Sequence, residues 1–328
     1  MSNLESNAVT HMRFIQIIIL GILLVAIGLT IQSSETFHPR DLVLPHDAAP
    51  QRDAGLQQTV DRTMSEHPGT LVVVDVSSGA ILASNNLRLA ETAVQTPGST
   101  LKPFVLMALL ELNRLDPEQR LICKRELQIG SAHLDCTHPI SVTQLDADDA
   151  IAYSCNSYFA QVSLRLSSNE LDQAFRSAGF DSPTGLVEND ASGHIRVPVN
   201  QDQIQLEALG DDGIEVTPLE LLEAYRKLAL RKRNGDAGKG APVFDGLEHS
   251  VAYGMANAAY VSDMKVAGKT GTASSRSNPR THGFFAGYAP AEKPEIALVV
   301  FVQQGRGLDA AGLAQQVFAE YSHGDRRK

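Results

Sequence analysis

The sequence predicts an α+β protein in two lobes, with one antiparallel sheet built from strands at both ends and a helical lobe inserted between them. Two observations predict this class. Strand-like segments occur near residue 70 and again after residue 260, and the long middle of the chain carries helix signals. Because sequential groups of strands and helices are typical of α+β folds, we expect the two groups of strands to join in one sheet.

The composition supports a globular body. The chain has 328 residues, of which 43% are hydrophobic and 20% charged, and it has three cysteines. This apolar content is sufficient for a core, and it excludes low-complexity disorder, collagen and a disulfide-stapled miniprotein. The net charge of −10 opposes binding to a phosphate backbone, so no nucleic-acid partner is expected.

An apolar segment precedes the folded body. Residues 14–31 form a run interrupted only by Gln16 and Thr30, long enough to span a bilayer as one helix. The residues after it lack the small-x-small pattern of a cleavage site, which favours a retained anchor over a signal peptide. We therefore expect an N-terminal tail over residues 1–13, an anchor over 14–31 and a linker over 32–69.

The elements of the folded body follow in order. Residues 71–75 and 80–84 are largely apolar and flank a Ser-Ser-Gly turn, which predicts a hairpin. The clearest helix follows Thr217, with Pro218 at its first position and Glu220 placed for a capping box, and its last turn is basic. The other expected segments are three strands, a final helix and a charged tail, over residues 264–272, 282–288, 295–303, 309–321 and 323–328.

A serine and a lysine stand three residues apart where a buried helix is predicted to begin. Pro97-Gly98 is a turn signal, and the run after Pro103 is apolar on all sides. Residues three apart share a helix face, so the amine of Lys102 can reach the hydroxyl of Ser99. A lysine desolvated beside a second cation can have its pKa lowered enough to act as a base, which would make Ser99 a nucleophile.

A second motif is Ser154-Cys155-Asn156. It places a hydroxyl and a carboxamide two residues apart in a loop between predicted helices. There the hydroxyl can relay a proton and the carboxamide can hold a substrate amide. The S-x-N pattern also occurs at Ser84, where a strand ends, and at Ser167, where Ser167 with Glu170 predicts a helix cap.

The third motif, Lys269-Thr270-Gly271-Thr272, lies on a predicted strand. Lys269 and Gly271 point to one face of that strand and the two threonines to the other. A glycine at a sheet edge lets a ligand backbone approach closely, so an extended peptide could pair there. A charged edge position that discourages aggregation is the alternative. The S-x-x-K spacing recurs at Ser262 and Lys265, so each motif alone is weak.

The three motifs occur in the order S-x-x-K, S-x-N and K-T-G, on a helix start, a loop and a strand. In this combination the sequence resembles the transpeptidase domain of penicillin-binding proteins. The resemblance covers about residues 70–322 and implies the fold described above, an acyl-serine enzyme and no cofactor. It extends beyond the triad to the segments 97–104, 213–220, 268–273 and 282–290.

The resemblance implies catalytic roles for the matching residues. Ser99 would be the nucleophile acylated by a D-alanyl-D-alanine stem peptide, and Lys102 would take its proton. Ser154 would relay that proton to the departing D-alanine, and Asn156 would hold the peptide amide. Lys269 would keep the site electropositive and help to lower the pKa of Lys102.

The resemblance also implies a substrate-binding strand. Thr270 would bind the terminal carboxylate of the stem peptide, and Gly271 lies between the two threonines. The backbone N–H groups of Ser99 and Thr272 would form the oxyanion hole.

The implied activity is that of a peptidoglycan D,D-transpeptidase that is trapped by β-lactams. Peptidoglycan lies outside the cytoplasmic membrane, so the catalytic body would face the periplasm and residues 1–13 the cytoplasm. Only the short segment 32–69 separates the anchor from the first strand, which implies a short single-pass form without a pedestal domain. A glycan polymerase or another cell-wall protein is the expected partner.

Other functions share these motifs. A D,D-carboxypeptidase, which gives the acyl group to water, has every one of them. A class A β-lactamase is disfavoured, because no E-x-x-L-N pattern lies between Asn156 and Lys269. A β-lactam sensor or an inactive scaffold would use the same pocket only for binding.

The cysteines leave several interpretations open. Cys123 and Cys136 lie close together in the sequence, with His133 and His138 nearby. An oxidising exterior favours a disulfide over free thiols, and both over zinc. Cys155 is expected to be a packed small side chain. Because the ten histidines show no H-x-x-x-H spacing, no metal site is predicted.

Overall fold

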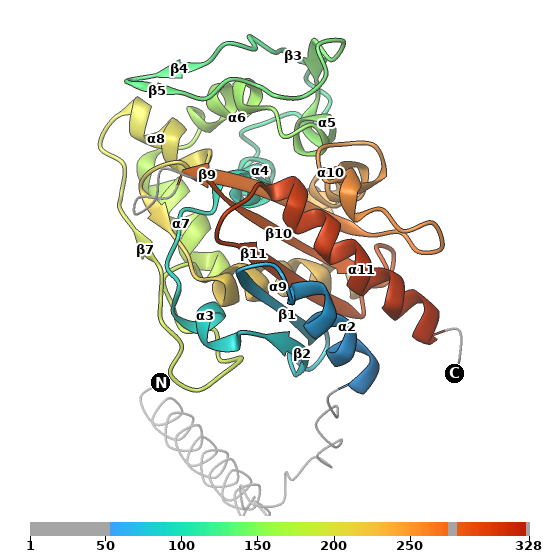
Figure 1. The fold of residues 1–328 in the computed structure, drawn as a ribbon. Helices are drawn as coiled ribbons and strands as arrows, with labels where there is room; N and C mark the ends of the chain where they lie inside the picture. The colour runs from blue at the N-terminus through green and yellow to red at the C-terminus, as the bar shows by residue number, and fades with distance from the viewer. Residues whose placement is uncertain (1–52, 275–280, 326–328) are drawn as a thin grey trace, which may run out of the picture. The chain divides into compact units, whose positions relative to one another are not determined.

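The computed structural model describes residues 53–274 and 281–325. A five-stranded antiparallel sheet forms its centre, in the order β2-β1-β11-β10-β9 (Figure 1). The strands are β1 (Gly69–Asp75), β2 (Ile81–Asn85), β9 (Ala267–Ser274), β10 (Thr281–Ala289) and β11 (Ile296–Val302). The predicted α+β class is confirmed, because the C-terminal strand β11 pairs with the N-terminal strand β1.

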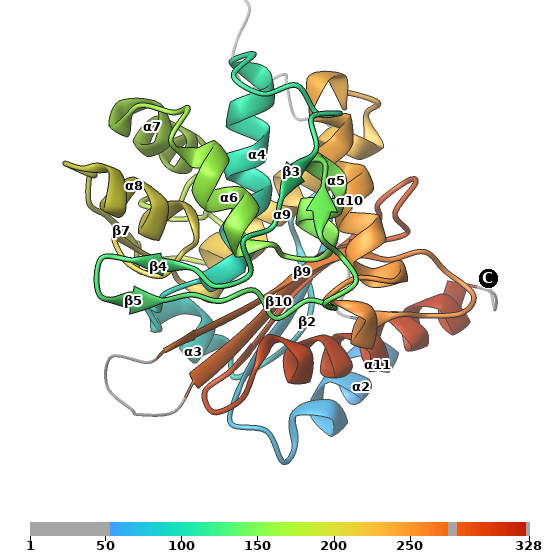
Figure 2. The ribbon, with the colours of Figure 1, turned by 90° about the horizontal axis from the view of Figure 1, so that it is seen from above.

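A helical lobe lies between β2 and β9 in the sequence and covers one face of the sheet (Figure 2). Its helices are α3 (Leu87–Thr92), α4 (Lys102–Glu111), α5 (Ala147–Ala152), α6 (Asn156–Ser163), α7 (Ser168–Ala178), α8 (Gln201–Ala208), α9 (Pro218–Arg233) and α10 (Ala241–Ala252). Three 3-10 helices accompany them: η1 (Gly98–Leu101), η2 (Gly238–Gly240) and η3 (Asn257–Ala259). Short strand pairs join β3 (Leu121–Ile122) to β6 (Gln144–Leu145), β4 (Gln128–Ile129) to β5 (Ala132–His133), and β7 (His194–Ile195) to β8 (Ile214–Glu215).

The sheet separates two hydrophobic cores. Val72 and Val74 of β1 pack with the helical lobe, while Leu71 and Val73 face the opposite side. On that opposite side the sheet is covered by α2 (Ala54–Met64) and α11 (Gly307–Asp325) (Figure 1). Strand side chains alternate between faces, and both faces of β1 are buried, which is why its sequence is a continuous apolar run.

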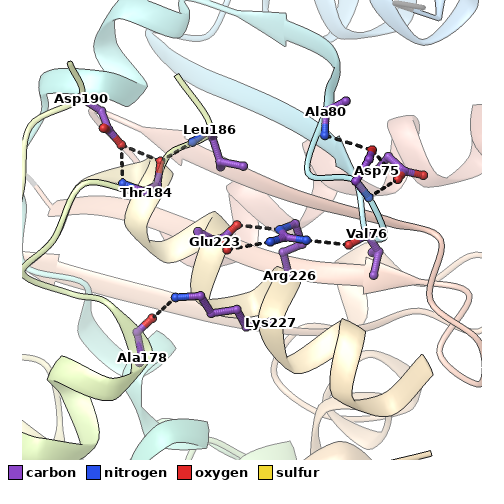
Figure 3. Close-up of polar contacts among 11 residues, drawn as sticks. Asp75, Val76, Ala80, Ala178, Thr184, Leu186, Asp190, Glu223, Arg226 and Lys227 are labelled. Carbon is purple, nitrogen blue, oxygen red and sulfur yellow. Dashed lines mark hydrogen bonds and ion pairs between the residues drawn. The ribbon is translucent and has the colours of Figure 1, made fainter. Parts of the chain in front are cut away.

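Helix α9 begins as predicted and is fastened to the sheet. The Thr217 hydroxyl accepts the N–H of Glu220 at 3.1 Å, and the Glu220 carboxylate accepts the N–H of Thr217 at 2.7 Å. Further along the helix, Arg226 donates to both carboxylate oxygens of Glu223 at 2.6 and 2.8 Å and to the carbonyl of Val76 at 2.8 Å (Figure 3). Because Val76 directly follows β1, this pair ties the buried helix to the sheet.

Two predicted segments differ from the structure. The predicted linker 32–69 contains helix α2, whose first turn is capped by Asp53 through the N–H groups of residues 55 and 56. Helix α11 continues to Asp325, past the predicted end at residue 321 and into the predicted charged tail. Both differences arise because apolar side chains of α2 and α11 share one core.

The predicted tail 1–13 and anchor 14–31 lie outside the described residues. Within residues 53–274 and 281–325, none of the helices combines the length and the apolar character that a membrane span requires.

Candidate active site

Ser99 lies in the turn that opens the buried helix α4. The turn is the 3-10 helix η1, and Gly98 within it has a left-handed backbone with φ of +57°. The N–H of Gly98 donates to the carbonyl of Gly210 at 3.0 Å, which fixes the turn to the loop after α8. Ser99 is partly exposed, and its hydroxyl has no hydrogen-bond partner in the described part of the chain. The candidate nucleophile is therefore accessible, and among the described residues the expected contact between the Lys102 amine and this hydroxyl is not formed as a hydrogen bond.

Lys102 is fully buried one turn after Ser99. Its ammonium donates to the carbonyl oxygen of Ser154 at 2.7 Å, to the Ser154 hydroxyl at 3.3 Å and to the Asn156 side-chain oxygen at 2.5 Å. An ammonium group has three hydrogens to donate, and all three acceptors belong to the S-x-N motif. The first and second predicted motifs therefore meet through this lysine.

Lys269 reaches the same serine from the sheet. It is fully buried on β9, and its ammonium donates to the Ser154 hydroxyl at 2.8 Å and to the carbonyl of Thr270 at 3.2 Å. The Ser154 oxygen thus lies between two lysine amines, one from each lobe. This is the position that a proton relay requires.

The electrostatics of the site are set by burial. Burial lowers the pKa of Lys102 to about 8, against the opposing influence of Cys155 and Cys136. Burial, followed by repulsion from Lys102, lowers the pKa of Lys269 well below its usual range. Desolvation is the largest cause of both shifts, and the repulsion between the two ammonium groups disfavours their being charged at the same time. The neutral amine of Lys102 is consequently accessible near physiological pH.

The S-x-N loop has a specific backbone shape. Ser154 has a left-handed conformation with φ of +54°, and Cys155 caps helix α6. The Asn156 amide donates to the carbonyl of Leu134 at 2.9 Å, which connects the loop to the β4–β5 segment. Sequence reasoning did not anticipate this contact, because residues 134 and 156 are joined only by the fold. Both ends of the Asn156 carboxamide have protein partners here.

The K-T-G strand β9 is the edge of the sheet and lies against the Ser99 turn. A Cβ atom at Gly271 would lie 2.3 Å from the carbonyl oxygen of Pro97. A Cβ atom at Gly98 would lie 3.1 Å from the backbone nitrogen of Thr272. We expected Gly271 to leave space for a ligand backbone. In the structure, the space beside Gly271 is occupied by the turn that carries Ser99.

The two threonines of the motif point to the other face of β9, as predicted. The Thr272 hydroxyl accepts the N–H of Gly307 at 2.8 Å, and the Thr270 hydroxyl donates to the carbonyl of Met255 at 3.4 Å. Thr272 is exposed, and Thr270 is 8% exposed. Of the two hydroxyls, that of Thr272 is the more accessible.

The second copies of the S-x-x-K and S-x-N patterns, which we call decoy motifs, do not join this centre. Ser262 and Lys265 are exposed, and Lys265 pairs with Glu248 at 2.7 Å and Glu292 at 3.2 Å. Ser167 and Glu170 form the predicted capping box of α7.

All three cysteines are buried free thiols, so the favoured Cys123–Cys136 disulfide is wrong. Cys123, Cys136 and Cys155 instead cluster with His138, with their sulfur and nitrogen atoms all within 4.8 Å of one another. Within the described residues, these four side chains form a group close to the S-x-N loop that could hold a metal ion. From the sequence, Cys123, Cys136 and His138 stand close together but no metal site is predicted, and Cys155 is expected only to be a packed side chain.

A two-lobed α+β fold that brings the S-x-x-K, S-x-N and K-T-G motifs together is the arrangement of acyl-serine transferases of the penicillin-binding type. The chain belongs to the penicillin binding protein transpeptidase domain family, whose model matches residues 69–322.

The individual relatives are distant. The chain is 25% identical to the peptidoglycan D,D-transpeptidase MrdA of Acinetobacter baumannii, over 81% of this chain and 52% of that protein. It is 26% identical to the stage V sporulation protein D of Bacillus subtilis, over 68% of this chain and 40% of that protein. The chain thus spans about half the length of the curated relatives that it matches.

Solved structures confirm the fold. The transpeptidase domain of penicillin-binding protein 3 from Burkholderia pseudomallei has a TM-score of 0.73 at 20% identity, covering 83% of this chain and 95% of that one. Helicobacter pylori PBP2, solved in complex with MreC, has a TM-score of 0.73 at 19% identity, covering 83% of this chain and 63% of that one.

Proposed function

We propose that this protein is a peptidoglycan D,D-transpeptidase that forms an acyl-enzyme through Ser99 with D-Ala-D-Ala stem peptides. One observation carries the proposal: the Ser154 hydroxyl accepts hydrogen bonds from both Lys102 at 3.3 Å and Lys269 at 2.8 Å. Lys102 follows Ser99 by one turn and shares the Ser154 hydroxyl with Lys269, which supports Lys102 as the base and Ser154 as the relay toward the leaving group. The family and the names of its relatives support the same activity.

In the acylation step, the Ser99 oxygen attacks the carbonyl carbon of the penultimate D-alanine. The neutral amine of Lys102 takes the hydroxyl proton, and Ser154 passes a proton to the nitrogen of the terminal D-alanine as the peptide bond breaks. The N–H groups of Ser99 and Thr272 stabilise the oxyanion. An amine of a neighbouring stem peptide then attacks the ester, forms the cross-link and returns the proton to the site.

The strand β9 is suited to hold the donor peptide. It is the edge of the sheet and passes directly beside the Ser99 turn, so an extended stem peptide can lie along it. Thr270 would bind its terminal carboxylate, and Lys269 adds positive charge nearby. A β-lactam mimics this dipeptide, and opening of its ring by Ser99 would leave a stable ester.

The location and partners belong to the same proposal. We infer that residues 14–31 are a single transmembrane anchor and that the domain over 70–322 faces the periplasm, because peptidoglycan lies outside the cytoplasmic membrane. The length and apolar character of the run 14–31 support the anchor. A glycan polymerase or another cell-wall protein would supply or organise the strands to be cross-linked.

The first test is acylation of the full chain in detergent by a fluorescent penicillin, read by gel and intact mass. A stable adduct that is lost in Ser99→Ala and kept in Ser262→Ala supports the proposal, since the second variant removes the serine of the exposed S-x-x-K decoy. An adduct that decays rapidly indicates a β-lactamase, and absence of an adduct indicates a scaffold.

The second test identifies the acceptor. A D-Ala-D-Ala peptide is incubated with the protein, with and without a peptide that offers a free amine. Formation of the cross-linked product supports transpeptidation. Release of D-alanine with hydrolysed peptide as the sole product, even with the amine present, would replace it by the carboxypeptidase alternative.

A further inference from the structure

We propose that one structural Zn²⁺ ion is bound by four buried side chains beside the candidate active site, those of Cys123, Cys136, His138 and Cys155. All four are at most 8% exposed. Three thiols and an imidazole match the Cys₃His composition of structural zinc sites, which are four-coordinate and tetrahedral. Soft thiolate ligands in such a geometry favour zinc over the harder divalent ions.

Two of the ligand separations are close to those of a zinc tetrahedron, and all four ligand atoms lie within 4.8 Å of one another. Zinc–sulfur bonds of about 2.3 Å and zinc–nitrogen bonds of about 2.0–2.1 Å place two sulfurs about 3.8 Å apart and a sulfur and a nitrogen about 3.6 Å apart. Here the Cys136 and Cys155 sulfurs are 3.7 Å apart, and the Cys123 sulfur is 3.4 Å from Nε2 of His138. A disulfide would require about 2.0 Å.

The histidine is oriented for coordination. Its Nε2 faces the Cys123 sulfur, while its Nδ1 lies 3.2 Å from the carbonyl oxygen of Pro139. Nδ1 also lies 3.5 Å from an amino group of Arg125, so it has partners on the protein while Nε2 is directed at the sulfur. In the tautomer that donates Nδ1–H to the shorter of these contacts, the carbonyl, Nε2 keeps its lone pair for a metal. Arg125 donates to the backbone carbonyls of Cys136 at 3.1 Å and His138 at 2.7 Å, which holds the loop carrying both ligands.

The sulfurs also have partners typical of thiolates. The N–H of Ser157 donates to the Cys136 sulfur at 3.3 Å, and the N–H of Tyr158 donates to the Cys155 sulfur at 3.4 Å. Both N–H groups belong to the first turn of α6, whose dipole favours negative charge. The cluster therefore has oriented ligands and an outer shell of hydrogen bonds.

The site has a consequence for catalysis, and this part rests on the proposed function. Cys155 lies between Ser154 and Asn156, whose atoms contact the Lys102 ammonium. A bound ion would fasten this loop to the segment 123–138, in addition to the hydrogen bonds that Asn156 and Ser157 make with that segment. We expect the ion to position the Ser154 hydroxyl, and a displacement of about 1 Å there can cost about 100-fold in rate.

The metal site is tested on the full chain without any substrate. The purified protein is analysed for metals by mass spectrometry, and the apoprotein is titrated with Co²⁺ and read by absorption. We expect about one zinc per chain and the intense bands of tetrahedral cobalt with thiolate charge transfer. Failure to hold zinc after incubation with it, or octahedral cobalt spectra alone, would overturn the proposal.

Matched variants locate the ion. Cys136→Ser and His138→Ala should lose zinc, while His138→Cys, which supplies a fourth thiolate, should retain it. His133→Ala is the control, because His133 is an exposed histidine of the same segment. Zinc retained at full content in Cys136→Ser and His138→Ala would refute this ligand set. Circular dichroism of each variant verifies its fold.

The positioning role is tested on the unmodified protein. Chelation should slow acylation by penicillin about 10- to 100-fold, and added Zn²⁺ should restore it. An unchanged rate in the metal-free protein would refute the positioning role while leaving the metal measurements valid. A protein that binds zinc but forms no adduct under any condition would instead contradict the proposed function.

Discussion

Glu207 is a buried carboxyl group on α8 whose two oxygens have no hydrogen-bond partner within the described residues. It is 1% exposed and packs beside Gly213, where a Cβ atom would lie 3.3 Å from its Cγ. Burial, with a further contribution from Asp172, raises the pKa of Glu207 to about 8. We predict that Glu207→Gln stabilises the protein increasingly as pH rises from 5 to 7.5.

The sign and size of this stability change follow from the linkage between proton binding and folding. The pKa in the folded state lies above the usual value of 4.5, so the folded protein keeps a proton that the unfolded chain releases. The contribution of Glu207 to the unfolding free energy is therefore fully present below pH 4.5 and is lost as the pH rises toward 8. With 1.36 kcal/mol for each pKa unit, the loss between pH 5 and pH 7.5 is about 2–3 kcal/mol. A glutamine has no such loss.

The assay is denaturant unfolding of both proteins at pH 5 and pH 7.5. The difference between the two unfolding free energies should change by about 2–3 kcal/mol between these pH values in favour of the variant. Any constant cost of an amide at this position cancels in that comparison. Asp202→Asn, which removes an exposed carboxylate from the same helix, is the control. An equal difference at both pH values would show that Glu207 is ionised in the folded protein and refute the reasoning.

Three further predictions concern the site and its support. Because burial lowers the pKa of Lys102 to about 8 and only its neutral amine accepts a proton, the rate constant for penicillin acylation should rise about tenfold per pH unit below that value and level above it; a flat profile between pH 6 and 9 would contradict this role. Gly271→Ala would place a methyl 2.3 Å from a backbone oxygen of the Ser99 turn. It should lower the unfolding free energy by about 1–3 kcal/mol and abolish most of the penicillin acylation rate. Gly312→Ala, in open space on α11, is the control and should leave the unfolding free energy unchanged or raise it; denaturant unfolding and adduct formation measure both effects. Tyr225→Phe removes a buried hydrogen bond of 2.9 Å to the carbonyl of Thr100 and should lower the unfolding free energy by about 1 kcal/mol; an unchanged value would indicate that this bond adds no stability.

Local signals carried most of the fold prediction. The hairpin β1–β2, the capping box at Thr217 and the strands β9 to β11 were predictable because apolar β-branched runs, cap residues and turn residues are local signals that extend over a few positions. Helix α2 was missed because its sequence is largely polar and it is stabilised by packing against α11. Its core contacts come from the opposite end of the chain, as in the hydrogen bond between Thr63 and Gln316.

The candidate site was predictable only in part, for the same reason. The three motifs identified Ser99, Lys102 and Ser154 by their order along the chain. The sulfur cluster was not identified, because Cys155 joins the other ligands through the folding of the segment 123–138 over α6. Spacing along the chain predicts local geometry, whereas this cluster depends on tertiary structure.

The pairing of β1 with β11 also constrains how the protein can be made. Gly69 pairs with Val302, so the N-terminal hairpin is synthesised long before its partner strand. Until then β1 is an unpaired apolar edge, which makes an incomplete chain prone to aggregation. A chain that stopped before residue 296 would contain Ser99, Lys102 and Ser154 but would lack the strand that joins the two halves of the sheet. Reactivity toward stem peptides or β-lactams is therefore expected only after the last strand has been made and paired.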